Sequence, residues 1–170
     1  GNPRTPEIQF GIPLGLSYKG FDFSMLWQGS ALCSVQLSGP AVWDFPLYDQ
    51  SRTGKVRKMH LNRWTPETAA TATYPALHYG IHNNNKQQYS SLFLYDASYI
   101  RLKNVEIGYT LPKAWTSKAG IQSVRIYAQG QNLLTFDRLG DVDMDPEIKN
   151  GDGSWFPVQR VVNLGINMTF

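Results

Sequence analysis

Two histidines have the spacing of a metal site. His78 and His82 lie four positions apart, which on a helix brings two imidazoles to one side and lets them share a zinc ion. Gly80 lies between them and three asparagines follow at 83–85, so a helix is not expected there. The glutamate of the zinc-protease motif is also missing. We therefore expect no zinc site.

A second candidate metal site is an alternating acidic run, Asp141, Asp143 and Asp145, which begins like a calcium-binding loop. Pro146 stands where such a loop needs glycine, and Asp152 replaces the bidentate glutamate at its end. We therefore interpret the run as an acidic loop without a bound metal.

Candidate nucleophiles are equally few. Cys33 is the single cysteine, and it follows the apolar alternation of its segment, which indicates burial and not catalysis. Neither a G-x-S-x-G nucleophile motif nor a G-x-x-x-x-G-K phosphate loop is present. The sequence therefore predicts no catalytic residue, no cofactor and no enzyme.

The charged residues do not indicate a nucleic-acid partner. The chain has 16 basic and 13 acidic residues, and its one dense basic cluster combines Arg52, Lys55, Arg57 and Lys58 with His60. No aromatic platform or known binding fold surrounds this cluster, so a solvated loop is the better interpretation. No nucleic-acid binding is expected.

The composition favours a sheet with many aromatic residues. Aromatic residues make up 13% of the chain and charged residues 17%, which is below the roughly 25% of ordinary soluble domains. No run of 18 apolar residues and no signal peptide is present, so neither a transmembrane helix nor a secretion signal is expected. The start at Gly1 without a methionine suggests a chain cut from something longer.

Alternation of apolar and polar residues, with a period of two, dominates the sequence and predicts strands. Lys19-Gly20 suits a two-residue hairpin turn between the first two strands. Pro13 predicts a bulge or local break in the first one. About five antiparallel strands follow from the alternation, and their expected ranges are 8–18, 21–33, 99–111, 124–131 and 161–170.

The expected connections alternate between short (19–20, 112–122) and long (about 38–90, 137–159), an asymmetry typical of outer-membrane barrels. Aromatic residues flank the short connections and end the chain, as in the ring of aromatics at a membrane interface: Tyr18, Phe21, Tyr109, Trp115 and Phe170. A water-soluble β-sandwich has the same alternation, so the pattern leaves the solvent of the apolar face open.

Several ordered blocks, spread along nearly the whole chain, resemble one known family, the C-terminal region of SusC/RagA-type TonB-linked outer-membrane proteins. The blocks are GNP and TPE at 1–7, LSYKGFD at 16–22, NRWTPE at 62–67, ASYIRLKN at 97–104, GYTLP at 108–112, RIY and QNL between 125 and 133, DPE at 145–147 and GINMTF at 165–170. The terminal block also resembles the signal read by the barrel-assembly machinery: Gly165, Met168 and Phe170 match it, and Leu164 departs from it.

The resemblance implies an all-β fold of antiparallel strands with long outer loops, in which residues 1–170 form the C-terminal portion of a large transmembrane β-barrel. It implies a bacterial outer-membrane location and a part in TonB-dependent import of nutrients such as oligosaccharides or peptides. The implied partners are a SusD-like surface lipoprotein, the TonB system and outer-membrane lipid. The plug domain of such receptors is expected to lie outside this chain.

In such a barrel the polar side of each strand would line the lumen. Arg125, Tyr127, Gln129 and Gln131 then become candidate lumen-facing residues, which would contact the plug or the transported ligand. Four aromatic residues of the longest loop could stack on sugars, touch the lipoprotein or hold the loop together: Trp64, Tyr74, Tyr79 and Tyr89.

Two other functions remain open from the residues alone. The chain could be a soluble β-sandwich that binds carbohydrate, or a secreted structural or adhesive β-module that needs no small ligand. Five strands cannot close a large barrel, and their two unpaired edges would make an isolated chain prone to pairing. By itself the chain is therefore expected to form a small sandwich or an edge-paired oligomer.

Overall fold

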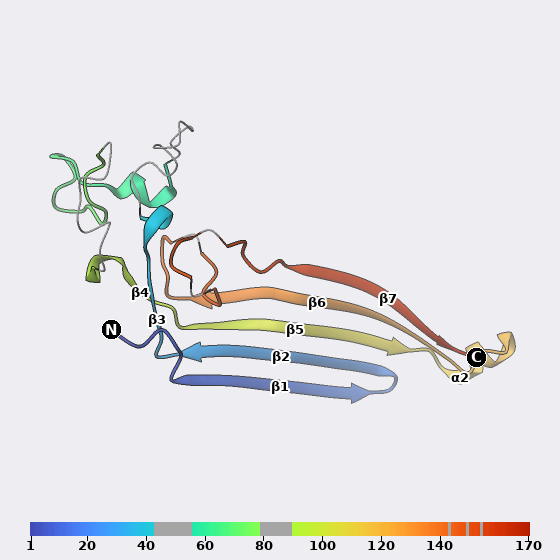
Figure 1. Ribbon diagram of the computed structural model, residues 1–170. Helices are drawn as coiled ribbons and strands as arrows, with labels where there is room; N and C mark the ends of the chain where they lie inside the picture. Colours follow the sequence, from blue (N-terminus) through green and yellow to red (C-terminus); the bar gives the residue numbers. More distant parts are fainter. Residues whose placement is uncertain (43–55, 79–89, 143, 149, 154) are drawn as a thin grey trace. The chain divides into compact units, whose positions relative to one another are not determined.

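The computed structural model describes residues 1–42, 56–78, 90–142, 144–148, 150–153 and 155–170 (Figure 1). The chain divides into two compact units, each built from three segments. Unit 1 comprises Gly1–Glu7, Ala31–Ser98 and Asp137–Pro157, and unit 2 comprises Ile8–Ser30, Tyr99–Phe136 and Val158–Phe170.

Unit 2 is a single five-stranded sheet with the order β1-β2-β5-β6-β7, in which neighbouring strands run antiparallel (Figure 1). The predicted all-β fold is therefore confirmed. The sheet is open, because β1 and β7 each have one edge without a partner in the described chain. Its strands are β1 (Ile8–Tyr18), β2 (Phe21–Ala31), β5 (Tyr99–Thr110), β6 (Ser123–Asp137) and β7 (Val161–Thr169).

Both short connections lie at one end of this sheet, together with the C-terminus (Figure 1). Lys19 and Gly20 both have positive φ angles, 46° and 88°, the conformation of the tightest hairpin turns. The second connection contains α2 (Lys113–Thr116) and η5 (Ser117–Ala119). The rings of Phe21 and Tyr109 face each other across β2 and β5 with centroids 4.4 Å apart.

A β-bulge changes the alternation within β5. Met25 pairs with Val105 and Leu26 with Asn104, but Trp27 pairs with Leu102, so Lys103 is an extra residue without an opposite on β2. The bulge explains why the apolar residues of β5 occupy odd positions from 105 onward and even positions at 100 and 102. It keeps them on one face of the sheet despite this change.

Two sequence predictions about strand boundaries were wrong. Of the bulge or local break predicted at Pro13, the break is absent: β1 runs as one strand from Ile8 to Tyr18 and lies at an edge of this sheet, where a missing N–H is tolerated at alternate positions. The second strand ends at Ala31 and not at residue 33, because Leu32 adopts a left-handed conformation with φ 54° that turns the chain out of the sheet.

Unit 1 has a small apolar core, which is formed by two clusters of buried residues. It includes a two-stranded sheet and short 3-10 turns, whose bounds are β3 (Ser34–Gln36), β4 (Leu94–Asp96), η1 (Gly39–Ala41), η3 (Lys58–Asn62) and η4 (Ser91–Phe93). Two buried clusters hold it together: Leu37, Ala41, Val42, Met59, Tyr74 and Phe93 in one, and Cys33, Val35, Ala97 and Leu139 in the other. The expected burial of Cys33 is confirmed.

Tyr74 holds the long loop together, which was one of the predicted roles. Only 4% of it is exposed, its ring packs against His60 and Phe93, and its hydroxyl donates to the Val42 carbonyl at 2.7 Å. Trp64, by contrast, is exposed. Tyr79 and Tyr89 lie outside the described residues. No helix in the described ranges is long and apolar enough to cross a membrane.

Candidate functional site

The four predicted lumen-facing residues lie on one face of the sheet in unit 2, because alternate residues of a strand point to the same side. The residues directly opposite them on β7 share that face. We call this side the polar face. Its β6–β7 pairs are Arg125 with Asn167, Tyr127 with Gly165, Gln129 with Asn163 and Gln131 with Val161.

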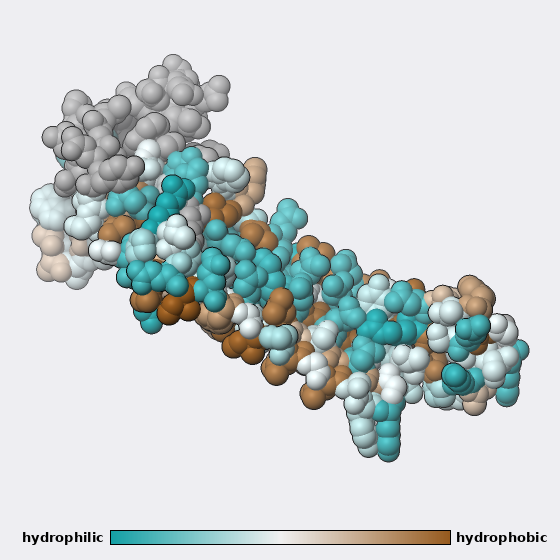
Figure 2. Space-filling model, turned by 60° about the horizontal axis from the view of Figure 1, so that its bottom comes forward, coloured by the Kyte–Doolittle hydropathy of each residue, from teal (hydrophilic) through white to brown (hydrophobic). Residues whose placement is uncertain are grey.

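The opposite side, which we call the apolar face, is almost purely hydrocarbon. Its β6–β7 pairs are Val124 with Met168, Ile126 with Ile166, Ala128 with Leu164 and Gly130 with Val162. The exposed fraction is 84% for Leu164 and 73% for Leu16 of β1. Figure 2 shows hydrophobic residues gathered in a band that follows the strands. Such an exposed apolar area is uncommon in soluble proteins and marks a contact with lipid or protein.

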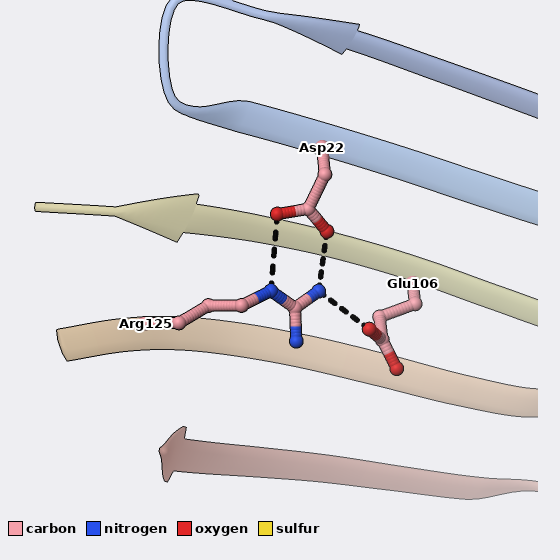
Figure 3. A network of polar contacts seen from close by, with 3 residues as sticks. All are labelled: Asp22, Glu106 and Arg125. Atoms are coloured by element: carbon pink, nitrogen blue, oxygen red, sulfur yellow. Dashed lines mark hydrogen bonds and ion pairs between the residues drawn. The ribbon is translucent and has the colours of Figure 1, made fainter. Parts of the chain in front are cut away.

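A three-residue ionic network lies on the polar face near the short connections (Figure 3). Arg125 of β6 donates from Nε to Asp22 Oδ1 at 3.0 Å and pairs through Nη2 with Asp22 Oδ2. The same Nη2 donates to Glu106 Oε1 at 2.6 Å. The two-point contact fixes the plane of the guanidinium. The network connects β2, β5 and β6 and contains one positive and two negative charges.

Two glycines make room for the long side chains of the polar face. A Cβ at Gly108, which lies opposite Asp22, would collide with the Arg125 guanidinium. A Cβ at Gly165 would collide with the Tyr127 ring, which covers that stretch of backbone. The guanidinium carbon of Arg125 lies 5.0 Å from the centre of the Tyr127 ring, within cation–π distance. The side chains of Arg125 and Tyr127 thus pack against each other above the two glycines.

A second arginine is buried on the polar face further along the strands. Arg101 of β5 is 2% exposed, lies opposite Gln28 and donates from Nε to Thr135 Oγ1 of β6 at 2.9 Å. Nearby, Asn132 has a φ of 53°, and its amide donates to the Gln159 carbonyl at 3.0 Å. Gln129 and Gln131 lie on β6 between Arg125 and Thr135, and both are half-buried.

Sequence reasoning missed most partners of this site. Asp22, Glu106 and Gly108 each occupy the polar positions of their strands, so the alternation carried a signal for which face they share. Their meeting with Arg125 depends on the register of three strands, and Asp22 lies 103 positions from Arg125 along the chain. Arg101 was missed because the bulge at Lys103 reverses the alternation before it.

The predicted acidic loop has ordinary polar contacts. Asp141 accepts a hydrogen bond from the Asn62 amide at 3.3 Å, and Asp145 accepts one from the Glu147 N–H at 2.9 Å. No group of three metal-binding side chains occurs among the residues that the structure describes. Asp143, His82, Arg52 and Lys55 lie outside those residues.

Asp96 and Tyr95, neighbours on β4 of unit 1, have pKa values outside their ordinary range. Hydrogen bonds from Ser98, together with the nearby Arg138, hold the pKa of the Asp96 carboxyl below its usual value. Burial raises the pKa of Tyr95, and the negative charge of Asp141 adds to this effect.

The sequence is similar to several TonB-dependent receptors, and no family model matches it. It is 31% and 30% identical to the TonB-dependent receptors P3 and P26 of Formosa agariphila, and it is aligned over its full length in both cases. It is 25% identical to the TonB-dependent receptor SusC of Bacteroides thetaiotaomicron over 96% of the chain. The chain spans 17% of the length of P3 and of P26.

Solved structures agree with these relatives. The fold matches the RagAB peptide transporter with a TM-score of 0.70 and 27% identity, over 98% of this chain and 18% of that one. It matches the RagAB peptide importer in its closed-closed state with a TM-score of 0.72 and 26% identity, over 98% of this chain and 17% of that one. This chain therefore belongs to the TonB-dependent receptors of the SusC/RagA type, which confirms the predicted family and outer-membrane location.

Proposed function

We propose that the chain forms part of the wall of a TonB-dependent importer, with its apolar face against lipid and its polar face toward the lumen. The observation that carries this proposal is the separation of the two faces. Hydrocarbon side chains are exposed on one side, whereas an ionic network and half-buried amides occupy the other. A barrel strand in a membrane needs this alternation because its two sides meet different solvents.

The exposed aromatic rings near the short connections fit the lower boundary of the membrane. Tyr18, Phe21, Trp115 and Phe170 are between 56% and 80% exposed. Amphipathic rings are most stable at the level of the lipid headgroups. With the C-terminus on the periplasmic side, this end of the sheet would lie at the periplasmic interface.

On the lumen side, Arg125, Tyr127, Gln129 and Gln131 would contact the plug of the receptor or its passing ligand. The network of Arg125 with Asp22 and Glu106 ties three wall strands together and leaves one negative charge in excess. Packing against the plug is the better role for Arg125 and Tyr127, because the two side chains are braced against each other and Arg125 is held by Asp22 and Glu106.

The transported material and the partners come from the family. Such an importer would take up oligosaccharides or peptides, work beside a SusD-like lipoprotein and draw energy from TonB. RagAB, which this chain resembles in fold, is described as a peptide importer.

A soluble carbohydrate-binding sandwich is the alternative, and no observation favours it. A sandwich needs a second layer over its apolar face. Leu16, Val162 and Leu164 are each more than 70% exposed, which leaves the apolar face without such a layer in the described chain.

Cysteine labelling of the receptor that contains this chain tests the proposal. Leu164→Cys and Asn163→Cys are neighbours on β7 and belong to opposite faces. In intact outer membranes, Leu164→Cys should resist a water-soluble maleimide and react with a lipid-soluble one, whereas Asn163→Cys should show the opposite preference. The unmodified receptor serves as the background, because Cys33 is 0% exposed.

Equal reaction of both cysteines with the water-soluble reagent would overturn the wall proposal. Recovery of the receptor chain in the soluble fraction, with Leu164→Cys protected from both reagents, would instead support a sandwich. The cargo is tested separately, by comparing uptake of labelled peptides and oligosaccharides in cells with and without the receptor.

A further inference from the structure

Unit 1 contains a cavity of about 290 Å³ that none of the proposed transport roles uses. Its apolar lining is formed by Leu37, Ala41, Val56, Met59, Val142 and Met144. Leu37, Ala41 and Met59 are themselves buried in the core of the unit. The cavity is slightly smaller than the usual ligand pocket, which has a volume of about 300 to 1,000 Å³. It therefore suits a single apolar group and not an extended ligand.

The walls of the cavity are held in place by hydrogen bonds. The Arg57 N–H donates to His60 Nδ1 at 3.1 Å and fixes the start of η3, on which His60 is 1% exposed. The Asn62 amide donates to Asp141 at 3.3 Å and joins the end of η3 to the opposite wall. The Ser38 N–H donates to the Gly151 carbonyl at 2.9 Å, which ties down the third side. A cavity with such walls is preformed.

Charged side chains of both signs share this lining with the apolar ones. Arg57 and Lys58 bring positive charge, and Asp141 brings negative charge. Arg57 is half-buried, and no carboxylate of the described residues forms an ion pair with it. Gly153 has a φ of 68°, and the Arg57 guanidinium lies 3.1 Å from where a Cβ would stand. The glycine thus leaves room for the guanidinium beside the cavity.

A half-buried guanidinium favours a planar anion, and a carboxylate matches its two parallel N–H groups. The two methionines of the lining are flexible and polarisable, so they adapt to apolar side chains of different shape. Asp141 already accepts a hydrogen bond from Asn62, and its second oxygen can receive an N–H of the ligand.

From this arrangement we infer that the cavity of unit 1 binds a carboxylate joined to one apolar side chain, as in the C-terminal residue of a peptide or a free apolar amino acid. The carboxylate pairs with Arg57 and Lys58, and the apolar side chain fills the space between Met59 and Met144. The inference does not depend on which way the sheet of unit 2 faces.

The test is equilibrium dialysis of the detergent-purified receptor against radiolabelled N-acetyl-leucine, titrated to about 10 mM, the range of weak small ligands. The matched probe is N-acetyl-leucinamide, which has the same side chain and lacks the carboxylate. We expect saturable binding of the acid and at least tenfold weaker binding of the amide. Equal binding of the two probes, or no saturable binding of the acid, would overturn the inference.

Two variants locate the site. Arg57→Gln should weaken binding of the acid at least tenfold and remove the preference over the amide. Arg63→Gln is the same change at an exposed arginine outside the lining. It should change neither the binding of the acid nor its preference over the amide. Equal loss in both variants would contradict the assignment. Should Arg57→Gln fail to fold, the comparison of acid and amide on the unmodified receptor still decides.

Two further ligands separate the two sources of this chemistry. Tighter binding of free leucine than of N-acetyl-leucine would show that Asp141 receives an ammonium group, so that the ligand is an amino acid. Tighter binding of N-acetyl-Ala-Ala-Leu would show a peptide end. The labelling of Leu164→Cys and Asn163→Cys in the Arg57→Gln receptor distinguishes a lost ligand site from a lost barrel wall.

Discussion

The guanidinium of Arg125 lies directly over the backbone of Gly108 and so reaches Asp22, two strands away from its own. Gly108 lies opposite Asp22 on the strand between them. The ionic network of the polar face thus exists only because one position has no side chain.

Gly108→Ala should therefore displace Arg125 from Asp22 and lower the temperature at which the folded receptor unfolds. Heat-dependent mobility in gel electrophoresis measures this temperature. Gly15→Ala is the matched control, because its new Cβ meets only the Phe23 carbonyl oxygen at an ordinary 3.9 Å. An equal effect of the two variants would show that the loss comes from glycine as such and not from the network.

Replacing Arg125 and replacing Asp22 should lower the unfolding temperature of the receptor by different amounts. Arg125→Gln leaves Asp22 and Glu106 close together without a neutralising charge, whereas Asp22→Asn keeps the pair of Arg125 with Glu106. We expect Arg125→Gln to lower the unfolding temperature more than Asp22→Asn does. High salt should reduce the difference, because it screens the repulsion between the carboxylates. A larger effect of Asp22→Asn would contradict this account.

A charge on the apolar face should be costly. Ile166→Lys places an ammonium group near the middle of β7, where a lipid-facing lysine costs about 2–4 kcal/mol. Asn163→Lys makes the same side chain on the polar face, opposite Gln129, and should cost less than about 1 kcal/mol. Urea unfolding of the receptor in lipid vesicles compares the two, and a similar free energy of unfolding for both would argue against a lipid-facing surface.

The hydroxyl of Tyr74 should stabilise unit 1. Tyr74→Phe leaves the buried Val42 carbonyl without this donor, at a cost of about 1–3 kcal/mol. The expected result is faster proteolysis of the segment between β3 and β4 in the intact receptor. Trp64→Phe changes an exposed ring of the same loop and should leave the cleavage rate nearly unchanged.

Acid should loosen unit 1 through Asp96. Its pKa is lowered in the folded state by hydrogen bonds from Ser98, together with Arg138, so the unfolded state binds a proton more readily. The stabilisation is therefore complete above about pH 4, the unfolded pKa, and is lost as the pH falls through the lowered folded value. Proteolysis of unit 1 between pH 2 and 6 should accelerate on acidification in the unmodified receptor.

Asp96→Asn is the control for this pH dependence, since it removes the titrating group and keeps its shape. The variant should be cleaved faster than the unmodified receptor at pH 6, and the two rates should converge at pH 2. A parallel pH dependence in both would assign the acid effect to other carboxyls.

The sequence by itself determined the strands of unit 2 and their two faces. Alternation with a period of two is a local property, and the turn at Lys19 and Gly20 is set by local φ angles, so both could be predicted from neighbouring residues. The shared face of Arg125, Tyr127, Gln129 and Gln131 followed from the same local rule.

Only the tertiary structure decided which of these residues meet. Three features depend on register and packing between distant segments: the bulge at Lys103, the contact between Arg125 and Asp22, and the cavity beside Arg57. Arg125 and Asp22 are 103 positions apart along the chain. Hydrogen-bond ladders accept many registers of similar energy, and a register is selected only when all the side chains of the sheet pack together. That selection is a property of the whole fold and leaves no signal in any one stretch of the sequence.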